Sequence, residues 1–191
     1  MPSRALRHWQ TRSRKVLDEF EAAHALVGGT PSARRFARQQ IAQAYVVLLC
    51  SQFQRFCREL HTEAADGLTS GVRAPLDEIF FKALTVGRKL DVGNPGPGNL
   101  GSDFSRFGIP FWDEVRLHNL RNEERQRTLE QLNRWRNAIA HQDFTHPALA
   151  GDEEVDVRQV RKWRRTCETL AVEFDTVIRL YLRSVLGRAP W

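Results

Sequence analysis

The stretch that decides the fold is Ser32 to Ala65, "SARRFARQQIAQAYVVLLCSQFQRFCRELHTEAA". Apolar side chains recur along it every three or four residues, which is the spacing of one face of an α-helix. This pattern is carried by Phe36, Ile41, Ala44, Tyr45, Leu48, Phe56 and Leu60. Ser32 follows Pro31 and is a suitable N-cap. The sequence therefore predicts a long central helix from Ser32 to about Ala65.

A second long helix is predicted from about Val155 to Leu186. Its apolar residues form a regular stripe, acidic residues precede it where the helix dipole favours them, and Gly187 stops it. Shorter helices are predicted at residues 4–26, 75–90 and 123–140, and no stretch alternates convincingly between apolar and polar residues as a strand would. We therefore expect an all-α helical bundle built on two long helices.

Residues 91–112, "DVGNPGPGNLGSDFSRFGIPFW", interrupt this helical pattern. Their Gly, Pro and Asn residues break helices, so we expect a loop insertion here. The loop also contains Phe104, Phe107, Ile109, Phe111 and Trp112, which a flexible linker does not need. We therefore expect a structured loop that packs back onto the bundle. No Gly-Lys-Ser/Thr follows the glycines, which argues against a phosphate-binding loop.

Length and composition indicate one domain, residues 1–191, with a core of about 32–186. The net charge is +6, and the basic residues are 25 Arg and only four Lys. Arginine binds phosphate bidentately, so RNA is an allowed partner. The three cysteines are widely spaced, as expected of buried, reduced thiols. No signal peptide or membrane span is found, and we expect a cytoplasmic protein.

The candidate catalytic residues lie in "LNRWRNAIAHQDFTHP", Leu132 to Pro147. Arg136 and His141 form an R-x4-H pair, but such a pair is expected by chance in so arginine-rich a chain, as Arg55 and His61 at R-x5-H illustrate. The setting of the motif gives it weight. Asn137 follows the arginine, Ala138 and Ala140 leave room for a phosphate or a second helix, and the helix end favours a protonated imidazole at His141.

Helix geometry limits how these residues can act. Positions five apart differ by roughly 140° around a regular helix and by about 7.5 Å along it, so Arg136 and His141 do not share a face. Asn137 and His141 do. For Arg136 and His141 to meet on one phosphate, either the helix end loosens or a second copy contributes. The motif therefore points to an oligomer.

The sequence "RNAIAH" at a helix end, after the long helix "QAYVVLLCSQFQRFCREL", resembles the HEPN superfamily of R-x4-6-H proteins. The segment "GNPGPGNL...DFSRFGI" is similar to that of stand-alone bacterial members, and the resemblance covers roughly Ser32 to Leu186. It implies a homodimer in which two motifs line one cleft. It also implies metal-independent RNA cleavage that leaves a 2′,3′-cyclic phosphate and a 5′-hydroxyl. Arg136 and His141 would be catalytic and Asn137 supporting, with no cofactor.

Two departures from the family pattern stand out. Many relatives carry Glu near Gln54, so Glu59 is the candidate substitute for that supporting acid. The antitoxin-paired branch continues as R-x4-H-x-Tyr, whereas this chain reads His141-Gln142-Asp143, which gives no support for control through that tyrosine.

Basic residues outside the motif are candidate RNA contacts, and each has an alternative as a solvated charge. The predicted RNA-binding residues are Arg134, Arg161, Arg164 and Arg165; further clusters are Arg34, Arg35 and Arg38, and Arg158 with Lys162. Trp135 is favoured as a core or dimer-interface anchor over a base-stacking platform. A metal site from His141, Asp143 and His146 lacks a fourth ligand, so no metal is predicted.

The leading hypothesis is a metal-independent endoribonuclease in a toxin or defence setting, with RNA, a second copy and an antitoxin or other regulatory protein as partners. The sequence leaves two alternatives open. One is a catalytically inactive HEPN-like module that binds RNA, a nucleotide or a protein. The other is a helical oligomerisation protein, which the long apolar stripes would also fit.

Overall fold

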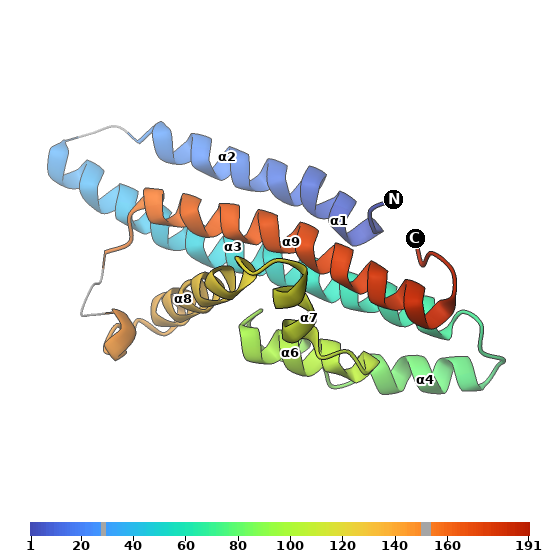
Figure 1. Cartoon of the computed structure of the whole chain (residues 1–191). Helices are drawn as coiled ribbons and strands as arrows, with labels where there is room; N and C mark the ends of the chain where they lie inside the picture. Colours follow the sequence, from blue (N-terminus) through green and yellow to red (C-terminus); the bar gives the residue numbers. More distant parts are fainter. Residues whose placement is uncertain (28–29, 150–153) are drawn as a thin grey trace.

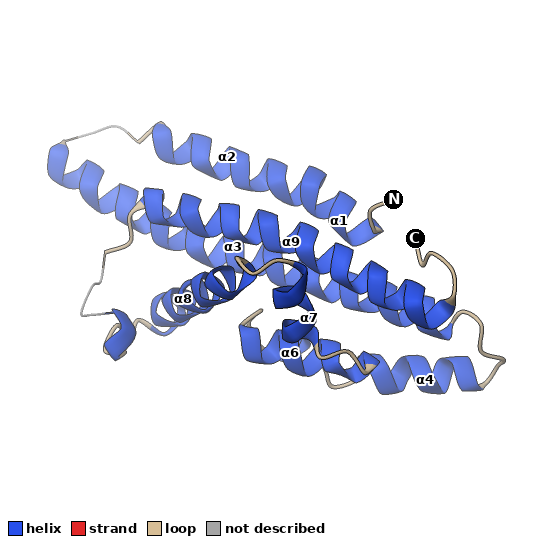
Figure 2. Ribbon diagram, viewed as in Figure 1, coloured by secondary structure: helices blue, strands red, loops and turns tan. Residues whose placement is uncertain are grey.

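The computed structural model describes residues 1–27, 30–149 and 154–191. Every regular element in these residues is a helix, so the all-α prediction is confirmed (Figure 2). The bundle is built on α3 (Pro31–Thr69) and α9 (Val157–Leu186), which lie side by side through the middle of the molecule (Figure 1). Both long helices predicted from the sequence are therefore present.

The ends of the two long helices follow local capping chemistry. Pro31 occupies the first turn of α3, and the Thr30 hydroxyl accepts from the Ala33 N–H at 3.4 Å. The Asp156 carboxylate caps α9 by accepting from the Arg158 N–H at 3.0 Å, and Gly187 ends that helix in the left-handed region at φ 67°. The helix starts lie within two residues of the predicted ones.

The predicted helix 4–26 is a nearly continuous stretch: α1 (Arg4–His8), a π-helical turn (Trp9–Ser13) and α2 (Arg14–Ala25). Its start is held by α3, because the Glu63 carboxylate accepts from the N–H groups of Arg4 and Ala5 at 3.0 and 3.1 Å. The stretch covers one side of the α3–α9 pair, and α8 (Asn122–His141) lies on the other (Figure 1).

The single helix predicted at 75–90 is wrong in its second half. In the structure this stretch contains two helices, α4 (Leu76–Thr85) and a short α5 (Lys89–Val92). They are separated at Gly87, whose φ is 70°. The start of α5 is fixed from a distance, because the buried Asp103 carboxylate accepts from the N–H groups of Lys89 and Leu90. Sequence periodicity contains no signal for such a long-range cap.

The loop predicted at 91–112 is corrected to mostly helix: α6 (Pro97–Phe104), a 3₁₀ turn (Ser105–Phe107) and the start of α7 (Phe111–His118). Pro97 stands at a first helical position, where proline is tolerated. Gly101 lets Trp112 approach, since a Cβ there would lie 3.1 Å from the Trp112 ring. Gly108 makes the left-handed turn before α7 at φ 82°. In residues 91–112, Gly108 therefore allows the turn between short helices, and Gly101 allows two of them to pack closely.

The expectation that this segment packs back onto the bundle is confirmed. Phe104 and Phe111 stack with ring centroids 4.5 Å apart, and Phe111 meets Phe174 of α9 edge-on at 5.0 Å. All three rings are fully or almost fully buried. Aromatic pairs of this kind add to the free energy of burial, so the segment is part of the core.

Candidate active site at the end of α8

Helix α8 ends immediately after His141 in a Schellman motif. Gln142 adopts the left-handed conformation at φ 53°, the Asp143 N–H donates to the Ala138 carbonyl at 3.0 Å, and the Gln142 N–H donates to the Ile139 carbonyl at 3.4 Å. The Gln142 side chain donates to the Ile139 carbonyl as well, at 2.8 Å. His141 is therefore the last helical residue, and its backbone position is set by these bonds.

One face of α8 belongs to the core. Leu132, Trp135, Ala138 and Ile139 are buried, and the Trp135 ring packs against Trp163 and Phe144. The preference for Trp135 as a core anchor is confirmed. Burial of Ala138 corrects the expectation that it leaves room for a ligand, whereas Ala140 is exposed.

The motif residues lie outside this buried face of α8. Asn137, Ala140 and His141 are exposed, and Arg136 is half-buried. The Arg136 guanidinium donates to Asn137 Oδ1 at 3.2 Å, and Asn94 donates to the same oxygen. Asn137 therefore accepts two hydrogen bonds and holds the guanidinium beside it, which suits a positioning residue.

Asn94 is a residue that the sequence analysis missed. It lies in the segment between α5 and α6. Asn133 of α8 donates to the Pro95 carbonyl of that segment. Gln54 of α3 donates at 2.7 Å to the Gly93 carbonyl of the segment and to the Leu90 carbonyl of α5. The only sequence signal of Asn94 was its place in the Gly/Pro-rich segment that resembles stand-alone HEPN proteins. Gln54 is thus connected to Asn137 by two hydrogen bonds, one to Gly93 and one from the next residue, Asn94.

Arg136 also interacts electrostatically with Cys50 of α3. Burial raises the pKa of the Cys50 thiol to about 12, and the positive charge of Arg136 opposes that rise. All three cysteine thiols are buried and unpaired with one another, as predicted.

The helix does not bring Arg136 and His141 together on one face. It remains α-helical through His141, so the roughly 140° separation of positions five apart applies. The sequence left two ways for Arg136 and His141 to meet on one phosphate: a loosened helix end or a contribution from a second copy. The end of α8 is not loosened.

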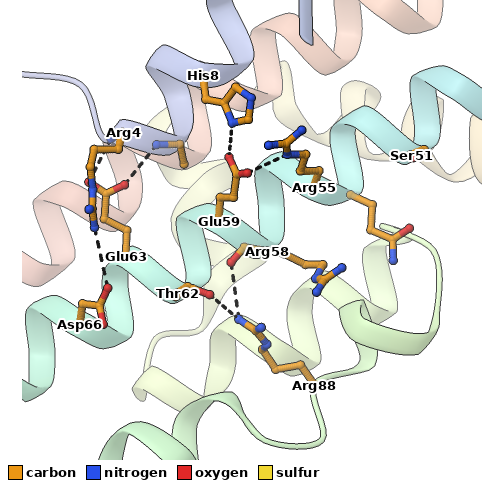
Figure 3. Close-up of a pocket in the computed structure, with 12 residues that line it drawn as sticks. Arg4, His8, Ser51, Arg55, Arg58, Glu59, Thr62, Glu63, Asp66 and Arg88 are labelled. Atoms are coloured by element: carbon orange, nitrogen blue, oxygen red, sulfur yellow. Dashed lines mark hydrogen bonds and ion pairs between the residues drawn. The ribbon is translucent and has the colours of Figure 1, made fainter. Parts of the chain in front are cut away.

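Glu59 lies in another place, a cleft of about 740 Å³ between α1, α3 and the start of α5 (Figure 3). Its carboxylate accepts from His8 Nδ1 and from Arg55, both at 2.8 Å, so it ties α1 to α3. Gln54 lines the same cleft. The carboxylate of Glu59 is occupied by these two partners, and a supporting role toward the motif stays a prediction.

The four predicted RNA-binding arginines differ in their surroundings. Arg134 pairs with Glu130 at 2.6 Å on the same helix, and Arg161 pairs with Glu21 at 3.1 Å, but both side chains are over two-fifths exposed. Arg165 is exposed on α9. RNA contact by these three stays a prediction.

The prediction for Arg164 is corrected. Its side chain is 10% exposed and bonds Asp18, Glu21, Glu168 and Tyr45, so it joins α2, α3 and α9 inside the protein. Burial acts to lower the pKa of Arg164, but the hydrogen bonds with Asp18 and Tyr45 raise it overall. Buried guanidinium groups are retained when their donors are satisfied in this way. Arg164 is therefore a structural residue.

Asp143 and His146, which follow the motif, are of residue types that can bind a metal ion. Hydrogen bonds from Thr145 lower the pKa of the Asp143 carboxyl, and the charges of His141 and His146 add to this. In the part of the chain that the structure describes, no group of three or more His, Cys, Asp or Glu side chains is arranged to hold a metal ion.

Comparison with known protein families shows to which family the chain belongs. Residues 11–179 match the family described as RiboL-PSP-HEPN. The chain belongs to this HEPN family. The match includes the motif of α8 and most of both long helices, and the resemblance drawn from "RNAIAH" is thereby confirmed. Membership supports an RNA-related, ribonuclease-like module. No curated protein and no solved structure matches the chain.

Among the described residues of this HEPN chain, none of the helices is both long and apolar enough to span a bilayer.

Proposed function

We propose that the protein is a metal-independent endoribonuclease whose site is completed by two copies of the chain. Arg136 of one subunit and His141 of the other would meet on one RNA phosphate. The setting that we propose is a cytoplasmic toxin or defence system, with an antitoxin or other regulatory protein as a further partner.

The observation that carries the proposal is that the Arg136 guanidinium is bonded to an amide and not to a carboxylate. Arg134 and Arg164 are each bonded to carboxylates, whereas the bond of the Arg136 guanidinium is to the neutral amide of Asn137. Among the residues that the structure describes, Arg136 forms no ion pair. A guanidinium without a counter-charge, on a family motif that also carries an exposed histidine, is available to an incoming phosphate.

The chemistry needs no further group. The ribose 2′-oxygen attacks phosphorus, the 2′-hydroxyl proton passes to water, and the bond from phosphorus to the 5′-oxygen breaks. The His141 imidazolium gives its proton to that leaving oxygen, and Arg136 stabilises the negative charge that builds on the phosphoryl oxygens. The products are a 2′,3′-cyclic phosphate and a 5′-hydroxyl.

The regular end of α8 supports the two-copy arrangement. Because the two side chains of one helix point in different directions, a single subunit does not offer both to one phosphate. Exposed Ala140 lies between Asn137 and His141 on the outward face and lets another chain approach closely.

The first test is RNA cleavage in EDTA by wild-type, Arg136→Ala and His141→Ala proteins, with Arg127→Ala, at an exposed arginine of the same helix, as a matched control. We expect each motif variant to lose about 10²–10⁴-fold in rate, the range of general acid–base catalysis, and the control to stay near wild type. Cleavage that survives both motif substitutions, or that requires a divalent metal, would contradict the proposal. RNA binding without cleavage would favour the inactive-module alternative.

A further inference from the structure

Three consecutive carbonyls of the segment between α5 and α6 each accept a hydrogen bond from a side-chain amide, and each amide comes from a different helix. The bonds run from Gln54 of α3 to Gly93, from Asn99 of α6 to Asn94 and from Asn133 of α8 to Pro95, at 2.7, 2.8 and 3.4 Å. Main-chain groups that are paired in this way hold the chain in one course. The main chain on both sides of Asn94 is therefore fixed by three helices.

The residue before Asn94 has to be a glycine for this arrangement to form. A Cβ at Gly93 would lie 2.8 Å from Asn99 Nδ2 and 3.1 Å from the Lys89 carbonyl oxygen. Asn99 uses that same nitrogen to donate to the Asn94 carbonyl. Glycine thus permits the close approach that holds Asn94 in place.

The Asn94 side chain is directed at the motif of α8. Its amide donates to Asn137 Oδ1, and the Arg136 guanidinium donates to the same oxygen at 3.2 Å. A guanidinium has only donors, so the atom of Asn137 that faces Arg136 has to be the oxygen. Because that oxygen only accepts, Asn94 has to present its NH₂ group to it. The contacts therefore fix the orientation of both amides.

This orientation leaves the NH₂ group of Asn137 unused. In the part of the chain that the structure describes, Asn137 Nδ2 has no hydrogen-bond partner, and the residue is exposed. Half a turn of the amide would place this NH₂ group against the Arg136 guanidinium and the oxygen toward an incoming phosphate, where both contacts are unfavourable. Asn94 opposes that rotation, because its own NH₂ group needs an acceptor at the same place.

We infer that Asn94 is a positioning residue of the proposed active site. It holds the Asn137 amide so that Oδ1 retains the Arg136 guanidinium and Nδ2 donates to a phosphoryl oxygen of the RNA. The phosphate then receives hydrogen bonds from Asn137 as well as from Arg136, and both stabilise the negative charge that builds on it. The inference rests on the proposed ribonuclease function for the identity of the substrate.

The first test is the rate of RNA cleavage in EDTA. Asn94→Ala should lower kcat about three- to tenfold, the range of one hydrogen bond, and change KM by less than about twofold, because the lost contact matters most when charge builds on the phosphate. Asn94→Asp should lose at least as much although its shape is nearly the same, since a carboxylate has no proton to donate to Asn137 and would neutralise Arg136.

The control for loss of a side-chain hydrogen bond is Asn119→Ala. The Asn119 amide donates to Glu173 at 2.9 Å, and it lies just before the other end of α8. Its substitution should leave kcat and KM unchanged. An Asn94→Asp protein as active as wild type, or equal losses in Asn94→Ala and Asn119→Ala, would overturn the inference.

A double-mutant cycle shows whether Asn94 acts through Asn137. Asn137→Ala should lower kcat, and adding Asn94→Ala to it should cause little further loss, because the group that Asn94 positions is already absent. Two losses that multiply in the double variant would give Asn94 a separate structural role and would contradict the inference.

A measurement without RNA keeps the inference separate from the ribonuclease proposal. The heteronuclear NOE of the Arg136 Nε–H group, assigned by its loss in Arg136→Ala, reports how rigidly the guanidinium is held on the ps–ns timescale. It should fall in Asn94→Ala and stay at the wild-type value in Val92→Ala, at a 93% exposed side chain beside the same segment. An unchanged NOE in Asn94→Ala would overturn the inference. A fall in the NOE in a protein that cleaves no RNA would refute the ribonuclease proposal alone.

Discussion

The side-chain amide of Gln54 donates to two main-chain carbonyls, Leu90 and Gly93. A carboxylate has no proton to donate at neutral pH, and it would place its negative charge against the same oxygens. A glutamate at position 54 would therefore not hold α5 and the residue after it in the same way.

We expect Gln54→Glu to lower the free energy of unfolding by about 1–3 kcal/mol, the cost of leaving partly buried polar groups without partners. Chemical denaturation at neutral pH measures this. Gln40→Glu, at an exposed site on the same helix, should be nearly neutral. A Gln54→Glu protein as stable as wild type would show that the two hydrogen bonds contribute little.

His61 ties stability to pH. Its Nε2 meets the Asp103 carbonyl at 3.0 Å and its Nδ1 meets the Arg88 guanidinium at 3.3 Å, so only a neutral ring with the proton on Nε2 satisfies both. Burial lowers the pKa of His61 from 6.5 to about 4, with a further contribution from the charge of Arg88.

Because the unfolded chain binds this proton more readily, the contribution of His61 is complete above pH 6.5 and falls as the pH drops toward about 4. The full change corresponds to about 3 kcal/mol. Unfolding free energies measured between pH 4 and 7 should therefore rise with pH, and His61→Gln, which keeps a donor and an acceptor, should remove this part of the slope. An unaltered slope in the variant would assign the pH dependence to other groups.

At the scale of elements, the end of α8 depends on one left-handed residue. Gln142 holds φ 53°, a conformation that costs a non-glycine residue about 1 kcal/mol and a β-branched one more. We expect Gln142→Gly to keep or slightly raise the melting temperature and Gln142→Val to lower the free energy of unfolding by about 1–2 kcal/mol. Thermal and chemical denaturation of this pair provide the test, and greater stability of the valine variant would contradict the cap.

The elements also show where sequence patterns fail. Long helices with a regular apolar stripe were predicted to within a few residues, because periodicity and caps are local. Residues 91–112 were predicted as a loop, since their glycines and prolines break long helices. Short α6 and α7 form there because Trp112 packs on Gly101 and Asp103 caps α5, and these contacts depend on the folded arrangement.

At the scale of the whole molecule, the two-copy site makes a prediction that one subunit cannot satisfy. Arg136→Ala and His141→Ala proteins, each inactive alone, should regain activity when they are unfolded and refolded together. Random pairing makes half of the dimers mixed, and each mixed dimer has one intact site of two, so about a quarter of wild-type activity is expected.

Cleavage of RNA in EDTA measures the recovery, with light scattering to confirm the dimer. Mixing either variant with itself is the control. No recovery by a verified mixed dimer would place both side chains in one subunit, and a monomeric protein that cleaves RNA would remove the shared site altogether.

The sequence alone determined the all-α class, the two long helices, the family and the placement of Arg136, Asn137 and His141 at a helix end, because these depend on residues within a few positions of one another. Only the tertiary structure decided which arginines are available to a ligand. Arg164 is neutralised by Asp18 and Glu21, more than a hundred residues away, whereas Arg136 is bonded to the neutral amide of Asn137, to which Asn94 donates from 43 residues away. Charge pairing acts through space, and the distances that govern it exist only once the helices have packed.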